Sequence, residues 1–221
     1  MSKNDTFINK IESFIYGKIA IKIMGRIIKI YEALLNRKEK ICHKSEIIEI
    51  IDEYNRTLGK VNAKNTLKYL SRHGYIRRIF LHFYYINSMD ERERGFCAYE
   101  DRELLFVVLN RVGIKWYLGM SSALYLSGKT WQTPNILTII NNNISGKKKI
   151  LEMNVRFFKI KDTLIFGLKR GRTKNNIRFL YSDQAKTHID IVYFRKSSKI
   201  IVVNHTAKYL RRYPKWLRKS I

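Results

Sequence analysis

The chain has 221 residues and a formal net charge of +26, because 44 Lys and Arg residues stand against 18 Asp and Glu residues. A hydrophobic fraction of 45% with only two prolines excludes a disordered basic tail protein, and the length suffices for one large or two small domains. The excess of positive charge favours a polyanionic partner, either a nucleic acid or an anionic membrane surface.

Signals for targeting, membrane insertion and metal binding are weak in this sequence. Residues 1–6 are polar, and the apolar run over 11–35 is interrupted by Lys and Arg, so no stretch of about 20 uncharged residues is available to span a bilayer. Cys42 and Cys97 lie far apart without Cys-x-x-Cys spacing, which predicts reduced thiols. We therefore expect a cytoplasmic protein that has no metal site or cofactor.

The first ninety residues show the 3.6-residue period of helices. A short apolar stripe falls within 7–15 and a longer one within 23–34. Ser45 is a candidate N-cap for a further helix, whose apolar positions lie within 47–54. These patterns predict a helical start to the chain.

A helix that begins after the candidate N-cap Asn62 and ends at Gly74 is followed by a change of period from 3.6 to 2. Residues 75–80 and 83–86 are rich in β-branched and aromatic side chains and predict a hairpin. Helices followed by a two-stranded hairpin are typical of a winged helix-turn-helix. We expect residues 1–89 to form such a DNA-binding domain.

The polar face of this last helix has the residue types that read double-stranded DNA. Lys and Arg can bind phosphates or guanine edges and Asn can pair with adenine, and no acidic residue occurs from Tyr54 to Met89. A merely solvated helix, which is the alternative interpretation, would normally include Glu or Asp. The candidate DNA-binding residues are Asn62, Lys64, Asn65, Lys68 and Arg72 on the helix, and Arg77, Arg78 and His82 on or near the wing.

A charged segment at 90–95 is expected to link this domain to a second one over 96–221. The second domain shows mixed patterns, which indicate an α+β fold. We predict helices at 100–110, 121–127 and 183–194, and strands at 136–140, 150–160, 163–168, 177–181 and 200–203.

Two segments of the second domain form a secondary basic surface. The loop Gly167–Asn176 contains cations and no acid, and it either contacts phosphates or an acidic protein surface, or is a solvated hairpin tip. Residues 195–221 carry nine cations and no acid, and the helical period within them places Thr206, Leu210, Tyr213 and Leu217 on one side. The candidate residues of this surface are Lys169, Arg170, Arg172, Lys174, Arg211 and Arg212.

Two motifs resemble the C-terminal domain of AbiEi-type antitoxins. The first lies within 116–140 and contains Tyr117, Ser122, Ala123, Leu124, Gly128, Gln132 and Pro134. The second lies within 181–194 and contains Ser182, Lys186, Thr187 and Asp190, although Ala185 stands where the family usually has Glu. The resemblance implies a winged-helix repressor of its own operon that counteracts a nucleotidyltransferase-like toxin.

Two other functions are compatible with the sequence. The first is a stand-alone winged-helix regulator, viral or plasmid-borne, that has no toxin partner. The second is a metal-dependent nuclease built on Asp183 and Asp190, together with Asp162, Glu152 and Lys186, but the usual acid-x-Lys pattern on a strand is absent. The simpler interpretation is that Asp183 caps a helix while Asp190 forms a local salt bridge.

Overall fold

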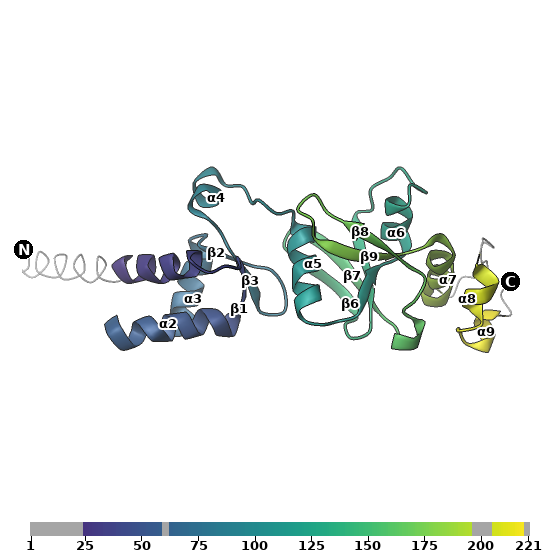
Figure 1. Cartoon of the computed structure of the whole chain (residues 1–221), viewed down its shortest axis with the longest axis horizontal. Coiled ribbons are helices and arrows are strands. Elements are labelled where there is room, and N and C mark those ends of the chain that lie inside the picture. The colour runs from purple at the N-terminus through teal and green to yellow at the C-terminus, as the bar shows by residue number, and fades with distance from the viewer. Residues whose placement is uncertain (1–23, 59–61, 196–204, 219–221) are drawn as a thin grey trace, which may run out of the picture. The chain divides into compact units, whose positions relative to one another are not determined.

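The computed structural model describes residues 24–58, 62–195 and 205–218. The chain divides into two compact units, Met1–Ala98 and Tyr99–Ile221 (Figure 1), each with helices and a small sheet. A mixed α+β fold is therefore confirmed. The apolar stripe within 7–15 and the strand expected at 200–203 lie outside the described residues.

The first unit packs helices against a three-stranded sheet of order β1-β3-β2. A helix over residues 24–35 precedes the elements β1 (Ile41–His43), α2 (Lys44–Leu58), α3 (Ala63–Arg72), β2 (Ile76–Arg78), β3 (Phe83–Ile86) and α4 (Met89–Arg94). The hairpin that we expected is present as β2 and β3, and its turn holds Leu81 and His82 at positive φ. β1, which we did not predict, pairs antiparallel with β3.

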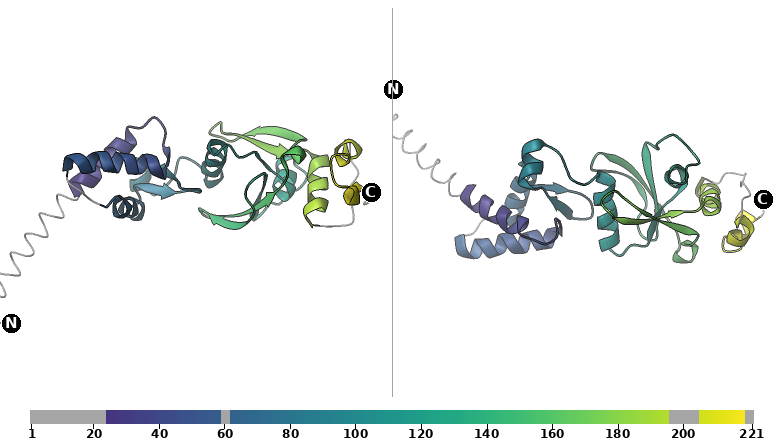
Figure 2. Two further views of the ribbon diagram at one scale, coloured as in Figure 1. Left: turned by 90° about the horizontal axis from the view of Figure 1, so that it is seen from below. Right: turned by 45° about the horizontal axis from the view of Figure 1, so that its top comes forward.

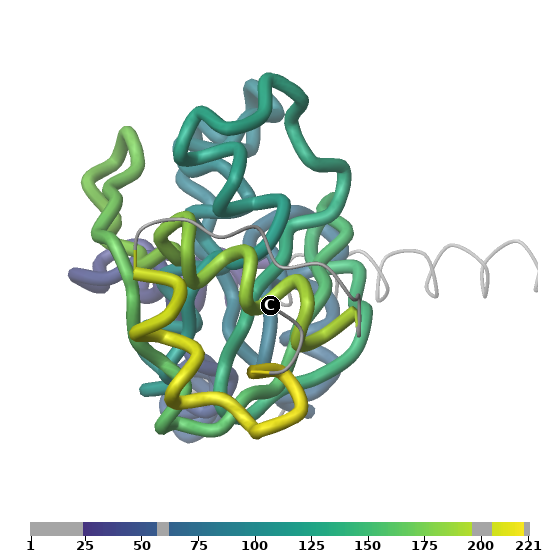
Figure 3. The backbone as a smooth tube through the Cα atoms, turned by 90° about the vertical axis from the view of Figure 1, so that its right-hand side faces the viewer, coloured from purple at the N-terminus to yellow at the C-terminus, as the bar shows by residue number. Residues whose placement is uncertain are grey.

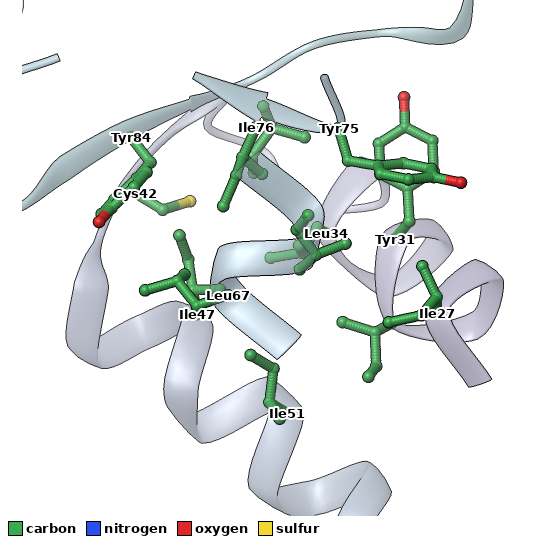
Figure 4. Packing of buried hydrophobic residues seen from close by; sticks show 13 residues of the cluster. Ile27, Tyr31, Leu34, Cys42, Ile47, Ile51, Leu67, Tyr75, Ile76 and Tyr84 are labelled. Carbon is green, nitrogen blue, oxygen red and sulfur yellow. The ribbon is translucent and has the colours of Figure 1, made fainter. Parts of the chain in front are cut away.

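The core of this unit collects apolar side chains from the first three helices and the three strands (Figure 4). Ile27, Tyr31 and Leu34 come from the first helix, as the apolar period predicted, and they meet Ile47 and Ile51 of α2. The cluster also contains Leu67 and Leu70 of α3, Tyr75 and Ile76 of the β2 segment, Cys42 of β1, and Tyr84 and Ile86 of β3. α3 therefore has one buried side and one free side.

Two helix starts in the first unit differ from our expectation. α2 begins at Lys44, one residue before the predicted cap Ser45, because the Glu46 carboxylate accepts a hydrogen bond of 2.6 Å from the His43 backbone N–H. Of residues 90–95, expected as a linker, 90–94 belong to α4, which Ser88 and Glu91 start with a capping box, and Gly95 ends the helix. The boundary between the units falls after Ala98.

The second unit is built on a six-stranded mixed sheet of order β6-β7-β5-β4-β9-β8. The strands are β4 (Trp116–Leu118), β5 (Ile136–Asn141), β6 (Gly146–Ile150), β7 (Met153–Lys159), β8 (Leu168–Arg172) and β9 (Arg178–Ser182). The helices are α5 (Asp101–Arg111), α6 (Met120–Leu126), α7 (Gln184–Arg195), α8 (Thr206–Leu210) and α9 (Lys215–Arg218), with a 3-10 turn at Asp162–Leu164.

The helices cover both faces of this sheet (Figure 2). Phe106 of α5 contacts Trp116 and Phe179 on one face. On the other face, Tyr117 and Ile140 pack with α7, and α8 and α9 lie beside α7 (Figure 3). Thr206, Leu210, Tyr213 and Leu217 are buried, so the side of the tail that we predicted to be apolar does pack on this unit.

Two strand predictions and one loop prediction in the second unit were wrong in detail. The run 150–160 is interrupted by a turn at Leu151, with φ +53°, so it contains the end of β6 and the whole of β7. Residues 163–167 are not a strand, because a 3-10 turn occupies Asp162–Leu164 and β8 begins only at Leu168. The loop predicted at Gly167–Asn176 is largely β8 itself, and only its end forms the hairpin tip.

Candidate nucleic-acid interface

The exposed face of α3 is the first candidate interface. The Asn62 side chain caps the helix by accepting a hydrogen bond of 2.9 Å from the Lys64 backbone N–H. Lys64, Asn65, Lys68 and Arg72 are all exposed, while Thr66, Leu67 and Leu70 are buried. Asn62 is therefore occupied as a cap, and the other four predicted residues lie on the free side of α3.

The charge pattern on α3 opposes the stability of the helix itself. Lys64, Lys68 and Arg72 follow one another at spacings of four, and like charges at that spacing repel each other. Lys64 also lies in the first turn, which has no acidic residue and where the positive end of the helix dipole disfavours a cation. This arrangement becomes favourable when the face lies against a polyanion.

The hairpin distributes its predicted residues over two faces. Arg77 pairs across the sheet with Tyr85 and Arg78 with Tyr84, so the two arginines project to opposite sides. Arg78 and His82 are exposed, whereas Arg77 is half-buried. Of the three wing residues that we predicted, Arg78 and His82 are therefore presented to solvent.

Hydrogen bonds and a cation–π contact fix the position of the hairpin relative to α3. The Tyr75 N–H donates to the carbonyl of Leu70 at 2.9 Å, and the Asn87 amide donates to the carbonyl of Gly74 at 2.8 Å. The Arg92 guanidinium lies 3.7 Å from the centroid of the Tyr75 ring. The elements that follow α3 are thereby tied to its C-terminal end.

Glu91 of α4 is a buried acid that sequence reasoning missed, although the capping box Ser88-x-x-Glu91 was readable. Its carboxylate accepts hydrogen bonds from the Tyr85 hydroxyl at 2.7 Å and from the backbone N–H groups of Ser88 at 2.7 Å and Ala98 at 2.8 Å. Burial alone would raise the pKa of Glu91, but these hydrogen bonds outweigh it and lower that pKa. Glu91 therefore fastens α4 to the hairpin as an anion.

The secondary basic surface is divided by the structure into two groups. Lys169, Arg170 and Arg172 are exposed on β8, and Lys174 is at the hairpin tip. Arg211 and Arg212 lie instead between α8 and α9, where the Arg212 guanidinium is 4.5 Å from the centroid of the Phe166 ring.

The cations of β8 border a groove that the sequence did not reveal. Arg172 pairs directly with Arg178 of β9, and like charges directly opposite each other destabilise a sheet. A groove of about 1020 Å³ is lined by both arginines, Arg170 and Lys115. Arg178 and Lys115 join this group through strand register, which no local sequence pattern reports.

Tyr117 of the first antitoxin-like motif meets Lys186 and Asp190 of the second in a buried cluster. The Lys186 ammonium donates to Asp190 at 2.5 Å, to the Tyr117 hydroxyl at 2.9 Å and to the Tyr213 hydroxyl at 2.6 Å. Burial lowers the pKa of Lys186, and the Asp190 carboxylate opposes that shift. The Ser182 and Thr187 hydroxyls share a hydrogen bond of 2.6 Å nearby. Lys186 and Asp190 have no exposed surface, so this salt bridge lies in the interior of the second unit.

The nuclease arrangement is not assembled by these residues. Asp183 caps α7 by accepting from the Lys186 backbone N–H at 2.8 Å, and Asp190 forms its salt bridge within the same helix, as the simpler interpretation predicted. Over the described parts of the chain, no group of three or more His, Cys, Asp or Glu residues is placed to hold a metal ion. No helix in those parts is long and apolar enough to cross a membrane.

Comparison with family models and with curated proteins finds no match. No family model matches the sequence, and no curated protein matches it significantly. The resemblance to AbiEi-type antitoxins therefore rests on the two sequence motifs alone.

Proposed function

We propose that this protein is a transcriptional repressor that binds double-stranded DNA, with α3 in the major groove and the β2–β3 hairpin as a wing. The observation that carries the proposal is the exposed, acid-free face of α3, with Lys64, Asn65, Lys68 and Arg72. It acts in the cytoplasm, where its operator is accessible.

The order of elements in the first unit supports this proposal. A helix, a strand, two further helices and two strands follow one another, and the first strand completes a sheet with the hairpin. Winged helix-turn-helix domains use this order, and they place the second helix of the helix pair in the major groove. Lys and Arg then neutralise phosphates or pair with guanine, and Asn pairs with adenine.

Alanine substitutions distinguish sequence reading from general electrostatic attraction. A binding site is first selected from random duplex DNA, and affinities are then measured for this site and for a scrambled duplex. Lys64→Ala and Asn65→Ala lower the preference for the selected site, since each base contact contributes about 1–3 kcal/mol. Arg78→Ala weakens both complexes alike, because a wing arginine contacts phosphate.

Lys29→Ala is the matched control. Lys29 is also an exposed lysine on a helix of the first unit, but it lies outside α3 and the hairpin. We expect Lys29→Ala to leave the preference for the selected DNA site over the scrambled duplex unchanged. If the α3 variants lose affinity equally for both duplexes, α3 does not read the bases.

The finer proposal is that this repressor is the antitoxin of a toxin–antitoxin pair. It is supported by Tyr117, Lys186 and Asp190, which come from both antitoxin-like motifs and bind one another. Co-expression of the chain with the product of its neighbouring gene tests this. Rescue from a toxic nucleotidyltransferase-like product supports the antitoxin, whereas repression without a toxic neighbour identifies a stand-alone regulator.

A further inference from the structure

The second unit contains a pocket on the sheet face that α5 covers. Its volume is about 440 Å³, within the range of about 300–1,000 Å³ that accommodates drug-sized molecules. Phe106, Leu118, Leu137 and Phe179 form its apolar floor and wall. Neither the DNA-binding face nor the buried Lys186 cluster uses this pocket.

The first turn of α5 holds the rim of this pocket in place. The Asp101 carboxylate accepts a hydrogen bond of 3.0 Å from the backbone N–H of Glu152, at the turn between β6 and β7. Glu103, which is buried, accepts a hydrogen bond of 2.8 Å from the Asn175 amide at the tip of the β8–β9 hairpin. Because both hairpin ends are fixed to one helix, the pocket is formed before anything enters it.

Trp131 projects from the loop that forms another part of the same rim. Its side chain is 92% exposed, although indole is among the largest apolar groups in proteins. Thr133, Pro134 and Asn135 of this loop line the pocket. Tyr125 and Ile136 on either side of the loop are also exposed apolar residues. An apolar projection and an apolar hollow therefore lie next to each other on one surface.

We propose that two copies of this chain associate through this surface, with Trp131 of each copy inserted into the pocket of the other. When projection and hollow lie on the same surface, a two-fold axis satisfies both contacts at once and closes the assembly as a dimer. The carboxylate of Glu152 and the amide of Asn154 line the pocket and offer acceptors for the indole N–H.

The charge of the pocket permits such a contact despite the net charge of +26. The charged residues lining it are Arg102, Arg172 and Glu152, so cation and anion partly cancel. Repulsion between the distant cations of two copies weakens the dimer at low salt. Dimerisation therefore strengthens as salt is raised, whereas binding to DNA weakens. The proposal is independent of DNA binding, and its test uses the free protein.

Sedimentation equilibrium of the full chain over a range of concentrations at moderate and high salt tests the proposal. The wild type shows a monomer–dimer equilibrium, and Trp131→Ala raises the dissociation constant by at least about thirty-fold, because a buried Trp anchor dominates an interface. Trp216→Ala is the control, since Trp216 is a partly exposed Trp on α9 of the same unit. It leaves the dimer intact.

A second variant tests the pocket that receives Trp131, instead of Trp131 itself. Asn154 is an exposed residue of β7 that lines the pocket, so Asn154→Trp fills the pocket without altering the core. Asn154→Trp alone is monomeric, like Trp131→Ala alone. A mixture of the two variants associates, because Trp131 of the first enters the open pocket of the second.

Four results would overturn the proposal. Three of them are a wild type that stays monomeric at all concentrations, a dimer that Trp131→Ala and Trp216→Ala weaken equally, and an assembly that grows beyond a dimer. A small molecule that co-purifies in the pocket of a monomeric wild type, detected by native mass spectrometry, would assign the pocket to that ligand and also overturn it.

Discussion

A single buried carboxylate, Glu91, makes the stability of the first unit depend on pH. Its hydrogen bonds lower its pKa in the folded protein below the ordinary value of about 4.3 for an exposed Glu. The stabilisation is therefore fully present above the unfolded pKa, and it is lost as the pH falls through the lowered folded pKa.

Glu91→Gln should destabilise the first unit by about 2 kcal/mol at pH 7, because an amide cannot accept all the hydrogen bonds that the carboxylate accepts. Native-state hydrogen exchange of the α3 and α4 amides measures this loss. The difference from wild type should shrink as the pH falls below the unfolded pKa and through the lowered folded pKa of Glu91, because the wild-type carboxyl group is then protonated.

Glu93→Gln provides the control for charge alone. Glu93 is on the same helix but is exposed, so its replacement should change the stability of the unit little at any pH. Equal losses for the two variants would show that Glu91 acts through the charge of α4 and not through its hydrogen bonds.

At the scale of elements, the close approach of β8 to α8 depends on Gly167. This glycine has φ +65°, and an added Cβ would lie 2.7 Å from the Tyr209 ring and 3.2 Å from the Lys186 Cβ. Tyr209 also donates a hydrogen bond of 2.8 Å to Asp183, so its ring is held in place. No larger residue fits here without moving α8.

Gly167→Ala should therefore destabilise the second unit more than Gly128→Ala does. Gly128 has φ +67° but open space around its Cβ position, so both variants share the backbone penalty of about 1 kcal/mol and differ in the clash. The clash should add about 1–3 kcal/mol. Urea unfolding followed by Trp fluorescence measures this, since all three Trp residues belong to the second unit. Equal losses of unfolding free energy in the two variants would mean that α8 moves away from the added methyl group without destabilising the unit.

Local signals predicted the elements that have strong local causes. Asn62 was recognised as a cap and Gly74 as the end of α3, because both act through the adjacent backbone. β1 was missed because three residues are too few to show a period, and its pairing partner β3 lies forty residues away. The turn at Leu151 was missed because a Leu at positive φ carries no sequence signal.

In the candidate site, too, local features could be predicted from the sequence and features that depend on distant partners could not. The exposed residues of α3 could be assigned from helical spacing, whereas the opposite faces of Arg77 and Arg78 depend on pairing with β3. Lys115 and Arg178 join the groove beside β8 only through the order of strands in the sheet. Asp190 was correctly paired locally, but its contacts with Tyr117 and Tyr213 link residues far apart in sequence.

In the molecule as a whole, both units have cationic surfaces. Each cation that contacts a DNA phosphate makes the affinity for DNA more sensitive to salt, because salt competes with that contact. The logarithm of DNA affinity changes with the logarithm of salt concentration by about 0.9 per contact on duplex DNA. The slope of the wild type therefore counts the phosphate contacts of the whole protein, whatever the DNA sequence. The change in slope caused by a variant in one unit counts the contacts that the substituted residues make.

If the groove beside β8 holds DNA, the double variant Arg170→Gln, Arg178→Gln should flatten the salt slope by about 1.8, the sum for two phosphate contacts from residues that line the groove but not the pocket of Trp131. The control is Lys147→Gln, Lys148→Gln on β6, which removes the same charge from two exposed residues of another strand of this sheet. The slope of this control should equal that of the wild type, because the two lysines change the net charge but contact no phosphate.

Equal changes in both double variants would show that the second unit attracts DNA only through its net charge. An unchanged slope in both, together with loss of protection from the neighbouring gene's toxin in the arginine variant alone, would instead assign the groove to a protein partner.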